Sequence, residues 1–382
     1  MTMLPASARI DRANPLPRHY QVRQILLDMI QSGLWQPGEK IPAETEIAQA
    51  LGISKMTVNK AILALTSEGV FYREVGRGTF VTQTPQESMG ARGLPEGAQV
   101  IEVVIVGAPE YVSDNEYLCS LLLSMRCCVS PLEVQLRLRQ ARGAEYVTVW
   151  QESHASGWVL IAPLQQDVPG LKALAAAGSR AVVLGASWEE VGLPCVDSDN
   201  VGGAAMAVEH LIALGHRHIG MLYGEADSIN TRDRIRGFQD TLRRHDLPFR
   251  ADWMIDVGSD ASILEAVRQR LRTWQTQAEA PSALFAAGPY IARQVLDIAQ
   301  ELGIAVPTAL SIVGFDDPTA VAEASPVLTT VRQPLEAMAK EAITALRAQL
   351  AAPDVLSTPM RRILPCRLLV RDSTAPPMRE AR

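Results

Sequence analysis

The sequence lacks the features that mark membrane, secreted and metal-binding proteins. It contains no run of 18 or more apolar residues, and residues 1–20 have no apolar core, so neither a transmembrane helix nor a secretory signal is expected. The five cysteines are an odd number without CxxC spacing, which argues against a disulfide framework and a zinc site. We therefore expect a cytoplasmic protein without a membrane partner.

Catalytic and cofactor motifs are also missing. No GxGxxG, P-loop, HExxH or GxSxG sequence occurs in a suitable context. We expect no catalytic residue, no metal and no cofactor.

Length and charge indicate more than one domain. The 382 residues, 47% of them apolar and 20% charged, suit a globular chain of two or three domains. Residues 1–85 carry nine Lys and Arg against seven Asp and Glu, a net charge of +2. The whole chain has a net charge of −6, so the remaining residues have a net charge of −8. A mildly basic head on an acidic body weakly favours nucleic acid as a partner of the head.

The first part of the chain has the pattern of a winged helix-turn-helix. Helical spacing of apolar residues runs from about residue 20 to Gly33, a shorter helix follows Pro42, and Ser54 suits the N-cap of a third helix. Residues 70–75 and 79–82 flank a Gly-Arg-Gly tip and predict a hairpin. We expect this domain over residues 16–82, after a disordered arm (1–15) and before a flexible linker (83–99).

The rest of the chain alternates short apolar strands with amphipathic helices. Strands are expected at 100–106, 158–162, 181–184, 219–223, 283–286 and 311–315, and helices near 116–125, 131–142, 170–177, 201–214, 233–245, 261–274, 290–302 and 334–351. This alternation predicts an α/β fold with parallel sheets. Residues 100–372 are enough for two such lobes, with a ligand cleft beyond the carboxyl ends of their strands.

The third helix of the head presents side chains that suit DNA. With its apolar residues inward, its outward set is Lys55, Met56, Thr57, Asn59 and Lys60. Cations suit phosphates or guanine, an amide suits adenine, and a hydroxyl suits either. The alternative is an ordinary solvated helix face.

The head resembles the GntR family of DNA-binding domains. The resemblance rests on Pro37-Gly38-Glu39-Lys40-Ile41-Pro42, on the run from Leu51 to Ala61, and on Gly76-Arg77-Gly78-Thr79-Phe80-Val81. It implies DNA contacts from Thr45, Ser54, Lys55, Met56, Thr57, Asn59, Lys60, Gly76, Arg77 and Gly78. Thr45 and Asn59 stand where arginine is frequent in that family, so we expect an operator that differs from the usual one.

The body resembles the effector domain of the LacI/GalR family. The matching segments include 196–203, 210–219, 231–238, 311–317 and 326–334. A GntR-type head on such a body is similar in architecture to the arabinose repressors of bacilli. The resemblance implies a homodimer and an effector contact from Arg232. Gly288-Pro289 replaces the Asn-Asp pair of the family, so Tyr290, Phe315 and Asp316 are candidate substitutes.

These expectations favour a ligand-responsive transcriptional regulator, most simply a repressor that binds a palindromic double-stranded DNA operator. The effector class left open is a sugar, polyol, nucleoside or sugar acid. The alternatives are an α/β enzyme or a solute-binding protein that carries an accessory DNA-binding head.

Overall fold

The chain divides into two compact units, Met1–Gly97 and Ala98–Arg382, called here the head and the body. The computed structural model describes residues 18–31, 33–67, 70–74, 77–82, 99–106, 116–129, 134–224, 227–257, 262–277, 279–288, 291–316, 327–351 and 360–377. The expected arm and residues 83–98 of the expected linker lie outside these ranges.

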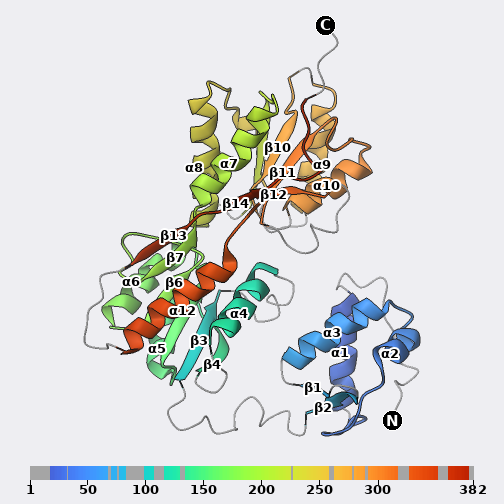
Figure 1. Cartoon of the computed structure of the whole chain (residues 1–382), viewed down its shortest axis with the longest axis vertical. Helices are drawn as coiled ribbons and strands as arrows, with labels where there is room; N and C mark the ends of the chain where they lie inside the picture. The colour runs from blue at the N-terminus through green and yellow to red at the C-terminus, as the bar shows by residue number, and fades with distance from the viewer. Residues whose placement is uncertain are drawn as a thin grey trace. The chain divides into compact units, whose positions relative to one another are not determined.

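The described residues of the head form three helices and a hairpin (Figure 1). The helices are α1 (Arg18–Gln31), α2 (Glu44–Leu51) and α3 (Lys55–Ser67), and the strands β1 (Phe71–Glu74) and β2 (Gly78–Val81) pair antiparallel. Their apolar residues form one core, which includes Leu26, Ile47, Ile62 and Phe71. α2 ends at Gly52, whose φ of 65° suits glycine. The predicted winged helix-turn-helix is confirmed.

The first lobe of the body contains a six-stranded parallel sheet in the order β13-β7-β6-β5-β3-β4. Its strands are β3 (Gln99–Ile105), β4 (Val134–Gln140), β5 (Gly157–Ile161), β6 (Ala181–Leu184), β7 (Cys195–Ser198) and β13 (Arg361–Leu364). One face is covered by α4 (Glu116–Cys128) and α12 (Leu335–Ala351), and the other by α5 (Tyr146–Glu152) and α6 (Val168–Ala176). Because both faces are covered, β5 is buried throughout.

The second lobe contains a six-stranded sheet in the order β14-β12-β11-β10-β8-β9, parallel except for β14. Its strands are β8 (Ile219–Tyr223), β9 (Met254–Asp256), β10 (Ala283–Ala286), β11 (Ser311–Phe315), β12 (Thr329–Arg332) and β14 (Arg367–Leu369). α7 (Asn200–Ala213) and α8 (Ile229–Arg244) cover one face, and α9 (Ser262–Trp274) and α10 (Ile291–Glu301) cover the other.

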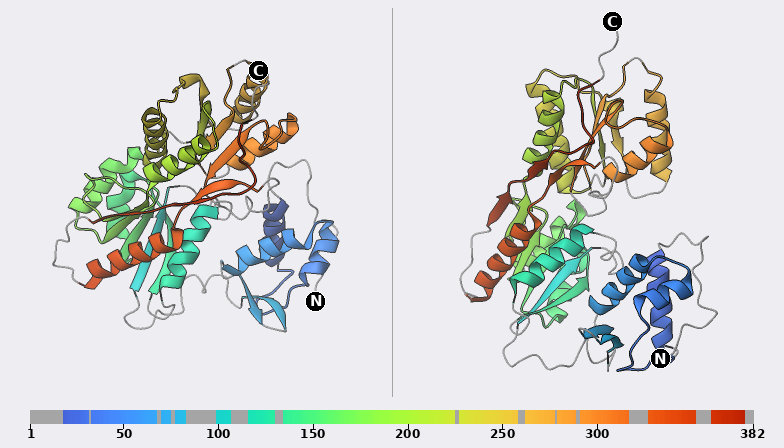
Figure 2. Two further views of the ribbon diagram at one scale, coloured as in Figure 1. Left: turned by 45° about the horizontal axis from the view of Figure 1, so that its top comes forward. Right: turned by 45° about the vertical axis from the view of Figure 1, so that its right-hand side comes forward.

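Three segments connect the two lobes. The chain crosses from β7 to α7, from β12 to α12, and from β13 to β14, so α12 and β13 belong to the first lobe although they follow the second in sequence (Figure 2). All three crossings leave strands at one edge of each sheet or next to it. This arrangement makes that edge the hinge of the body.

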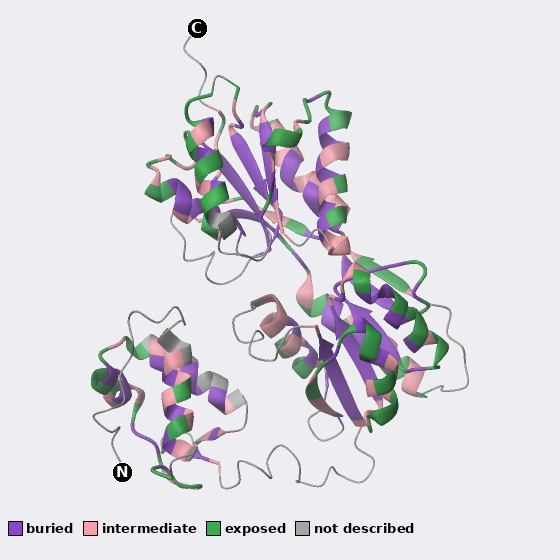
Figure 3. Ribbon diagram, turned by 180° about the vertical axis from the view of Figure 1, so that it is seen from behind, coloured by how far each residue is buried: buried purple, intermediate pink, exposed green. Residues whose placement is uncertain are grey.

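The fold class predicted from the sequence is confirmed, and the six predicted strands all exist. Figure 3 shows them buried at the centre of each lobe. The helix predicted over 131–142 is wrong, because residues 134–140 form β4. Val134, Leu136 and Leu138 alternate with polar residues, which is the period of a strand. The short strands β7, β9, β12, β13 and β14 and helix α5 were not predicted.

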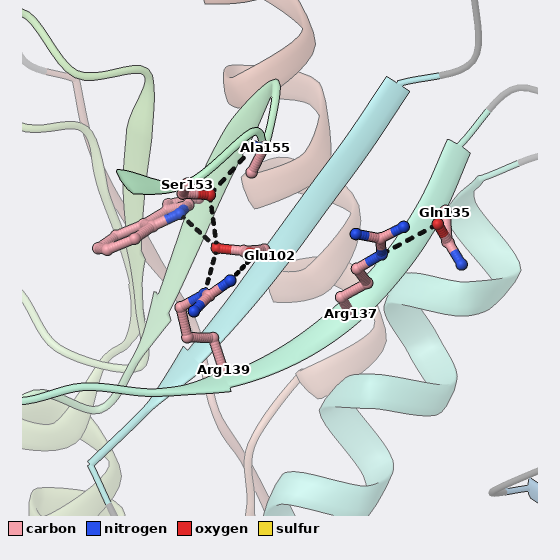
Figure 4. A network of polar contacts seen from close by, with 7 residues as sticks. Glu102, Gln135, Arg137, Arg139, Ser153 and Ala155 are labelled. Atoms are coloured by element: carbon pink, nitrogen blue, oxygen red, sulfur yellow. Dashed lines mark hydrogen bonds and ion pairs between the residues drawn. The ribbon is translucent and has the colours of Figure 1, made fainter. Parts of the chain in front are cut away.

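A buried carboxylate ties three strands and a loop of the first lobe together (Figure 4). Glu102 on β3 is 3% exposed and accepts two hydrogen bonds of 2.6 Å from Arg139 on β4. It also accepts hydrogen bonds of 2.9 Å from Ser153 Oγ and from Trp158 Nε1. Burial raises the pKa of Glu102, but these hydrogen bonds outweigh burial and hold the pKa below its ordinary value.

Within the described parts of the chain, no helix is both long and apolar enough to cross a membrane.

Candidate functional site

Helix α3, which the sequence predicts to contact DNA, begins with a capped first turn. Ser54 Oγ accepts a hydrogen bond of 3.2 Å from the backbone N–H of Thr57 and lies 2.8 Å from its hydroxyl. Ser54, Lys55 and Thr45 are exposed, and the Ser54 hydroxyl is engaged in the cap.

Asn59 has a protein partner. Its Nδ2 donates a hydrogen bond of 2.8 Å to Glu44 Oε1 on α2, and this contact ties the two helices of the motif together. This contact uses one of the two N–H groups of the Asn59 side-chain amide. The Met56 and Lys60 side chains lie outside what the structure describes.

The hairpin tip places a cation beside a glycine. Arg77 is exposed, with Cζ 5.9 Å from the centre of the Phe80 ring. Gly78 has a φ of 124°, a backbone conformation that favours glycine, and the Lys40 side chain lies beside it. Gly76 lies outside the described residues.

A second polar site lies between the two lobes of the body, centred on Arg234 of α8. Arg234 is 5% exposed, and its Cζ lies 3.7 Å from the centre of the Phe315 ring. Its Nε donates to Asn200 Oδ1 at 2.8 Å, and Nη1 donates to the carbonyl of Ala287 at 3.2 Å. A buried guanidinium fixed over an aromatic ring is a rigid donor for polar groups.

The hinge contributes a glutamine that joins both lobes to this site. Ser198 Oγ, at the end of β7, donates to Gln333 Oε1 at 2.6 Å, and Gln333 Nε2 donates to Asp316 Oδ1 at the end of β11. Asp316 is 9% exposed and has a φ of 77°, which is uncommon for a residue other than glycine. Strand ends of both lobes therefore meet through Gln333.

Two buried polar atoms next to this site have no hydrogen-bond partner among the described residues. They are the Tyr117 hydroxyl, from α4 of the first lobe, and Asn230 Oδ1, from α8 of the second. Gly185, at the end of β6, lies beside both residues. Its carbonyl accepts a hydrogen bond of 2.8 Å from Asn230 Nδ2, and a Cβ on Gly185 would lie 2.3 Å from the Tyr117 hydroxyl. Burial, with the charges of Asp197 and Asp316, raises the pKa of Tyr117, so its hydroxyl stays protonated.

Asp197 extends the buried cluster into the first lobe. Burial raises its pKa to about 7, while a hydrogen bond from the Ser198 N–H and the charge of Arg234 oppose the rise. A hollow of about 210 Å³ adjoins Asp197 and Asn200 and is also lined by Asp233, Arg236 and Arg361. Among the described residues, no group of three or more His, Cys, Asp and Glu is placed to hold a metal.

The residues expected to bind an effector are placed in different ways. Phe315 and Asp316 lie in the cluster, although Arg234 covers one face of the Phe315 ring. Arg232 lies half-exposed beside Asp227 and Gln165, and Tyr290 is outside the described residues.

Sequence reasoning missed Arg234 and Tyr117. The signal for Arg234 was present, because it falls on the helical face of the buried residues Thr231, Phe238 and Thr241, whereas Arg232 does not.

Two family models match the chain. Residues 19–81 match "Bacterial regulatory proteins, gntR family", and residues 208–374 match a periplasmic binding protein-like domain. The first covers the head, and the second covers most of the second lobe together with α12 and the C-terminal strands.

Several known proteins are similar over much of their length. The arabinose metabolism transcriptional repressor of Geobacillus stearothermophilus is 29% identical over 341 residues, which cover 86% of this chain and 89% of the relative. The regulator CelR of Thermobifida fusca is 30% identical over 58% of this chain and 64% of the relative. A LacI family transcriptional regulator from Mycobacterium smegmatis has a TM-score of 0.62 at 26% identity, covering 73% of this chain and all of that one. A complex of CelR with cellobiose has a TM-score of 0.64 at 22% identity, covering 87% of this chain and all of the other, and shows the same fold.

Proposed function

We propose that this chain, which carries a GntR-family helix-turn-helix domain followed by a periplasmic-binding-protein-like domain, is a transcriptional repressor controlled by a small polyhydroxylated ligand. The head binds the operator through α3 and the hairpin. The ligand binds between the lobes of the body and changes the affinity of the head for DNA. In this account the chain works in the cytoplasm, where its operator is.

The observation that carries the ligand site is the pair of unpartnered buried atoms beside Gly185. The Tyr117 hydroxyl offers a donor and Asn230 Oδ1 offers an acceptor, and among the described residues neither is satisfied. A buried polar atom without a partner costs about 1–3 kcal/mol. A ligand with hydroxyl groups recovers this cost at both atoms, because a hydroxyl both donates and accepts.

The class of ligand follows from these groups and from the relatives. Arg234, Asp316 and the two unpartnered atoms together suit a molecule with several hydroxyls, such as a sugar, polyol, nucleoside or sugar acid. The similar repressor of Geobacillus stearothermophilus is named for arabinose metabolism, and the similar CelR structure holds cellobiose. We take L-arabinose as the first ligand to test.

The DNA side of the proposal is a homodimer on a palindromic site. A two-fold dimer presents the same helix to each half-site, so the operator repeats in inverted orientation. Thr45, Ser54, Lys55, Thr57 and Arg77 are the proposed contacts among residues whose side chains the structure describes. Molar mass from light scattering, measured with and without a selected DNA fragment, tests the dimer.

A thermal-shift screen of the full chain tests the ligand site. The panel contains L-arabinose, cellobiose, ribitol, adenosine and gluconate. A ligand at 100 times its dissociation constant stabilises the body by about 2.7 kcal/mol. We expect stabilisation by at least one member, weakened in Tyr117→Phe. Equal stabilisation of the variant and the parent by that ligand contradicts this site.

A further inference from the structure

Besides the hydrogen bond from Asn230 Nδ2 to the Gly185 carbonyl, the contacts between the lobes among the described residues include two groups. One group is at the hinge, where Gln333 joins Ser198 to Asp316. The other joins the loop after β5 in the first lobe to the start of α8 in the second. β5 lies two strands from β7 in its sheet, and β8, which precedes α8, lies three strands from β12. At about 4.8 Å per strand, the second group is roughly 10–14 Å from the hinge.

We propose that Gln165, Asp227 and Arg232 form a latch that stabilises the closed arrangement of the lobes. Arg232 then acts on the ligand response by shifting lobe closure, not by touching the ligand. This inference rests on the proposed function only for its effect on ligand affinity. The latch itself is a property of the protein without ligand.

The latch consists of backbone and side-chain contacts that cross between the lobes. The backbone N–H of Gln165 donates to the carbonyl of Asp227 at 3.0 Å, and the N–H of Gln166 donates to Asp227 Oδ2 at 3.3 Å. Arg232 Nη1 donates to Gln165 Oε1 at 3.3 Å, and its Nη2 lies 3.8 Å from Asp227 Oδ1. Gln165 Oε1 also accepts a hydrogen bond of 3.2 Å from Nε1 of Trp188.

Each partner is held by its own lobe. Trp188 is 5% exposed and anchors Gln165 in the first lobe. Arg232 lies in the first turn of α8, whose buried face packs against the second lobe. Opening the lobes about the hinge therefore breaks these contacts together, while leaving each lobe intact.

The magnitude expected for the latch is modest. The side chains of Arg232 and Asp227 are 51% and 46% exposed, and an ion pair this accessible to water contributes little. Removing the guanidinium should lower the ratio of closed to open molecules about two- to five-fold. Because apparent affinity scales with the closed fraction, it falls by no more than this factor for every ligand of the closed form.

Hydrogen exchange of the ligand-free full chain tests the latch directly, because the amides of Gln165 and Gln166 donate across the lobes to Asp227. In Arg232→Ala we expect these two amides to exchange about two- to five-fold faster than in the parent. The matched control is Arg243→Ala, which removes an exposed arginine of the same helix whose partner, Asp240, lies on that helix. The control should leave both rates unchanged. Parental rates in Arg232→Ala overturn the latch.

Titration with L-arabinose separates the latch from a ligand contact. Arg232→Ala should weaken binding by no more than about five-fold. A loss of 100-fold or more with unchanged exchange overturns the latch and makes Arg232 a ligand contact. If L-arabinose does not bind the parent chain, that choice of ligand fails, while the exchange rates still decide the latch.

Discussion

Deleting the Tyr117 hydroxyl should make the protein more stable and its ligand binding weaker. The hydroxyl is buried between the lobes, and its oxygen has no hydrogen-bond partner among the described residues. Tyr117→Phe keeps the ring and removes only that atom. The variant therefore loses an unsatisfied buried group in the free protein, which should raise its stability. It also loses a hydrogen bond to the ligand in the complex, which should weaken binding.

The expected sizes follow from the cost of an unsatisfied buried group. Such a group costs about 1–3 kcal/mol, so Tyr117→Phe should raise the free energy of unfolding of the ligand-free body by up to that amount. For a domain of 150–250 residues, 1 kcal/mol corresponds to about 2–4 °C in Tm. One neutral hydrogen bond to the ligand contributes about 0.5–1.5 kcal/mol, so its loss weakens binding about two- to twelve-fold.

Calorimetric unfolding and ligand titration of the full chain measure both effects, and Ser179→Ala is the matched control. Ser179 Oγ is also buried and without a partner among the described residues, but it lies before β6, at the end of the strand opposite Gly185. The control should gain stability without losing affinity. A Tyr117→Phe protein that is less stable than its parent, or that binds ligand equally well, refutes the reasoning.

Three further predictions concern other parts of the chain. Arg139→Ala leaves Glu102 buried without its main partner, so we expect urea unfolding at pH 7 to show a loss of about 1–3 kcal/mol in the free energy of unfolding. The loss should be smaller at pH 4, because a carboxylate with a lowered pKa stops contributing to stability as the pH falls through that pKa. The pKa of Asp197 is raised from 3.8 to about 7, so Asp197 takes up a proton on folding between these pH values, and the free energy of unfolding falls as the pH rises from 4 to 7. In Asp197→Asn this dependence of stability on pH should be weaker. An unchanged dependence contradicts the raised pKa. Lys55→Ala and Arg77→Ala should each weaken operator binding and lower the slope of log affinity against log salt by about one, and an unaltered slope excludes a phosphate contact.

Local sequence patterns predicted most of the fold because they report burial along one element. The runs at 157–161, 181–184 and 311–315 are buried throughout and, apart from Ser311, apolar, as is typical of buried parallel strands. The segment 134–140 failed because its alternation lies on an edge strand, where Leu138 is 45% exposed and a helical spacing of Val134 and Leu138 fits equally well.

The site was predicted less well because its contacts come from segments far apart in the sequence. Arg232 and Arg234 both lie at the start of α8. Only the position of the buried face of this helix shows that Arg234 is buried and that Arg232, the latch residue, is not. Asn59 is an outward amide by helical period, yet it pairs with Glu44, 15 residues earlier. The Tyr117 hydroxyl is singled out by what it fails to contact, which no sequence pattern reports.

The central claim is that a ligand in the body controls DNA binding by the head. Its most direct test uses a DNA fragment that the full chain selects from random sequence. The fragment is labelled and titrated with protein, and its anisotropy is measured in the presence and in the absence of the ligand found in the thermal-shift screen. We expect the selected fragment to be an inverted repeat, and its dissociation constant for the parent chain to change at least ten-fold with ligand. In Tyr117→Phe the same change should require a higher ligand concentration. An operator affinity that is the same with and without saturating ligand contradicts it.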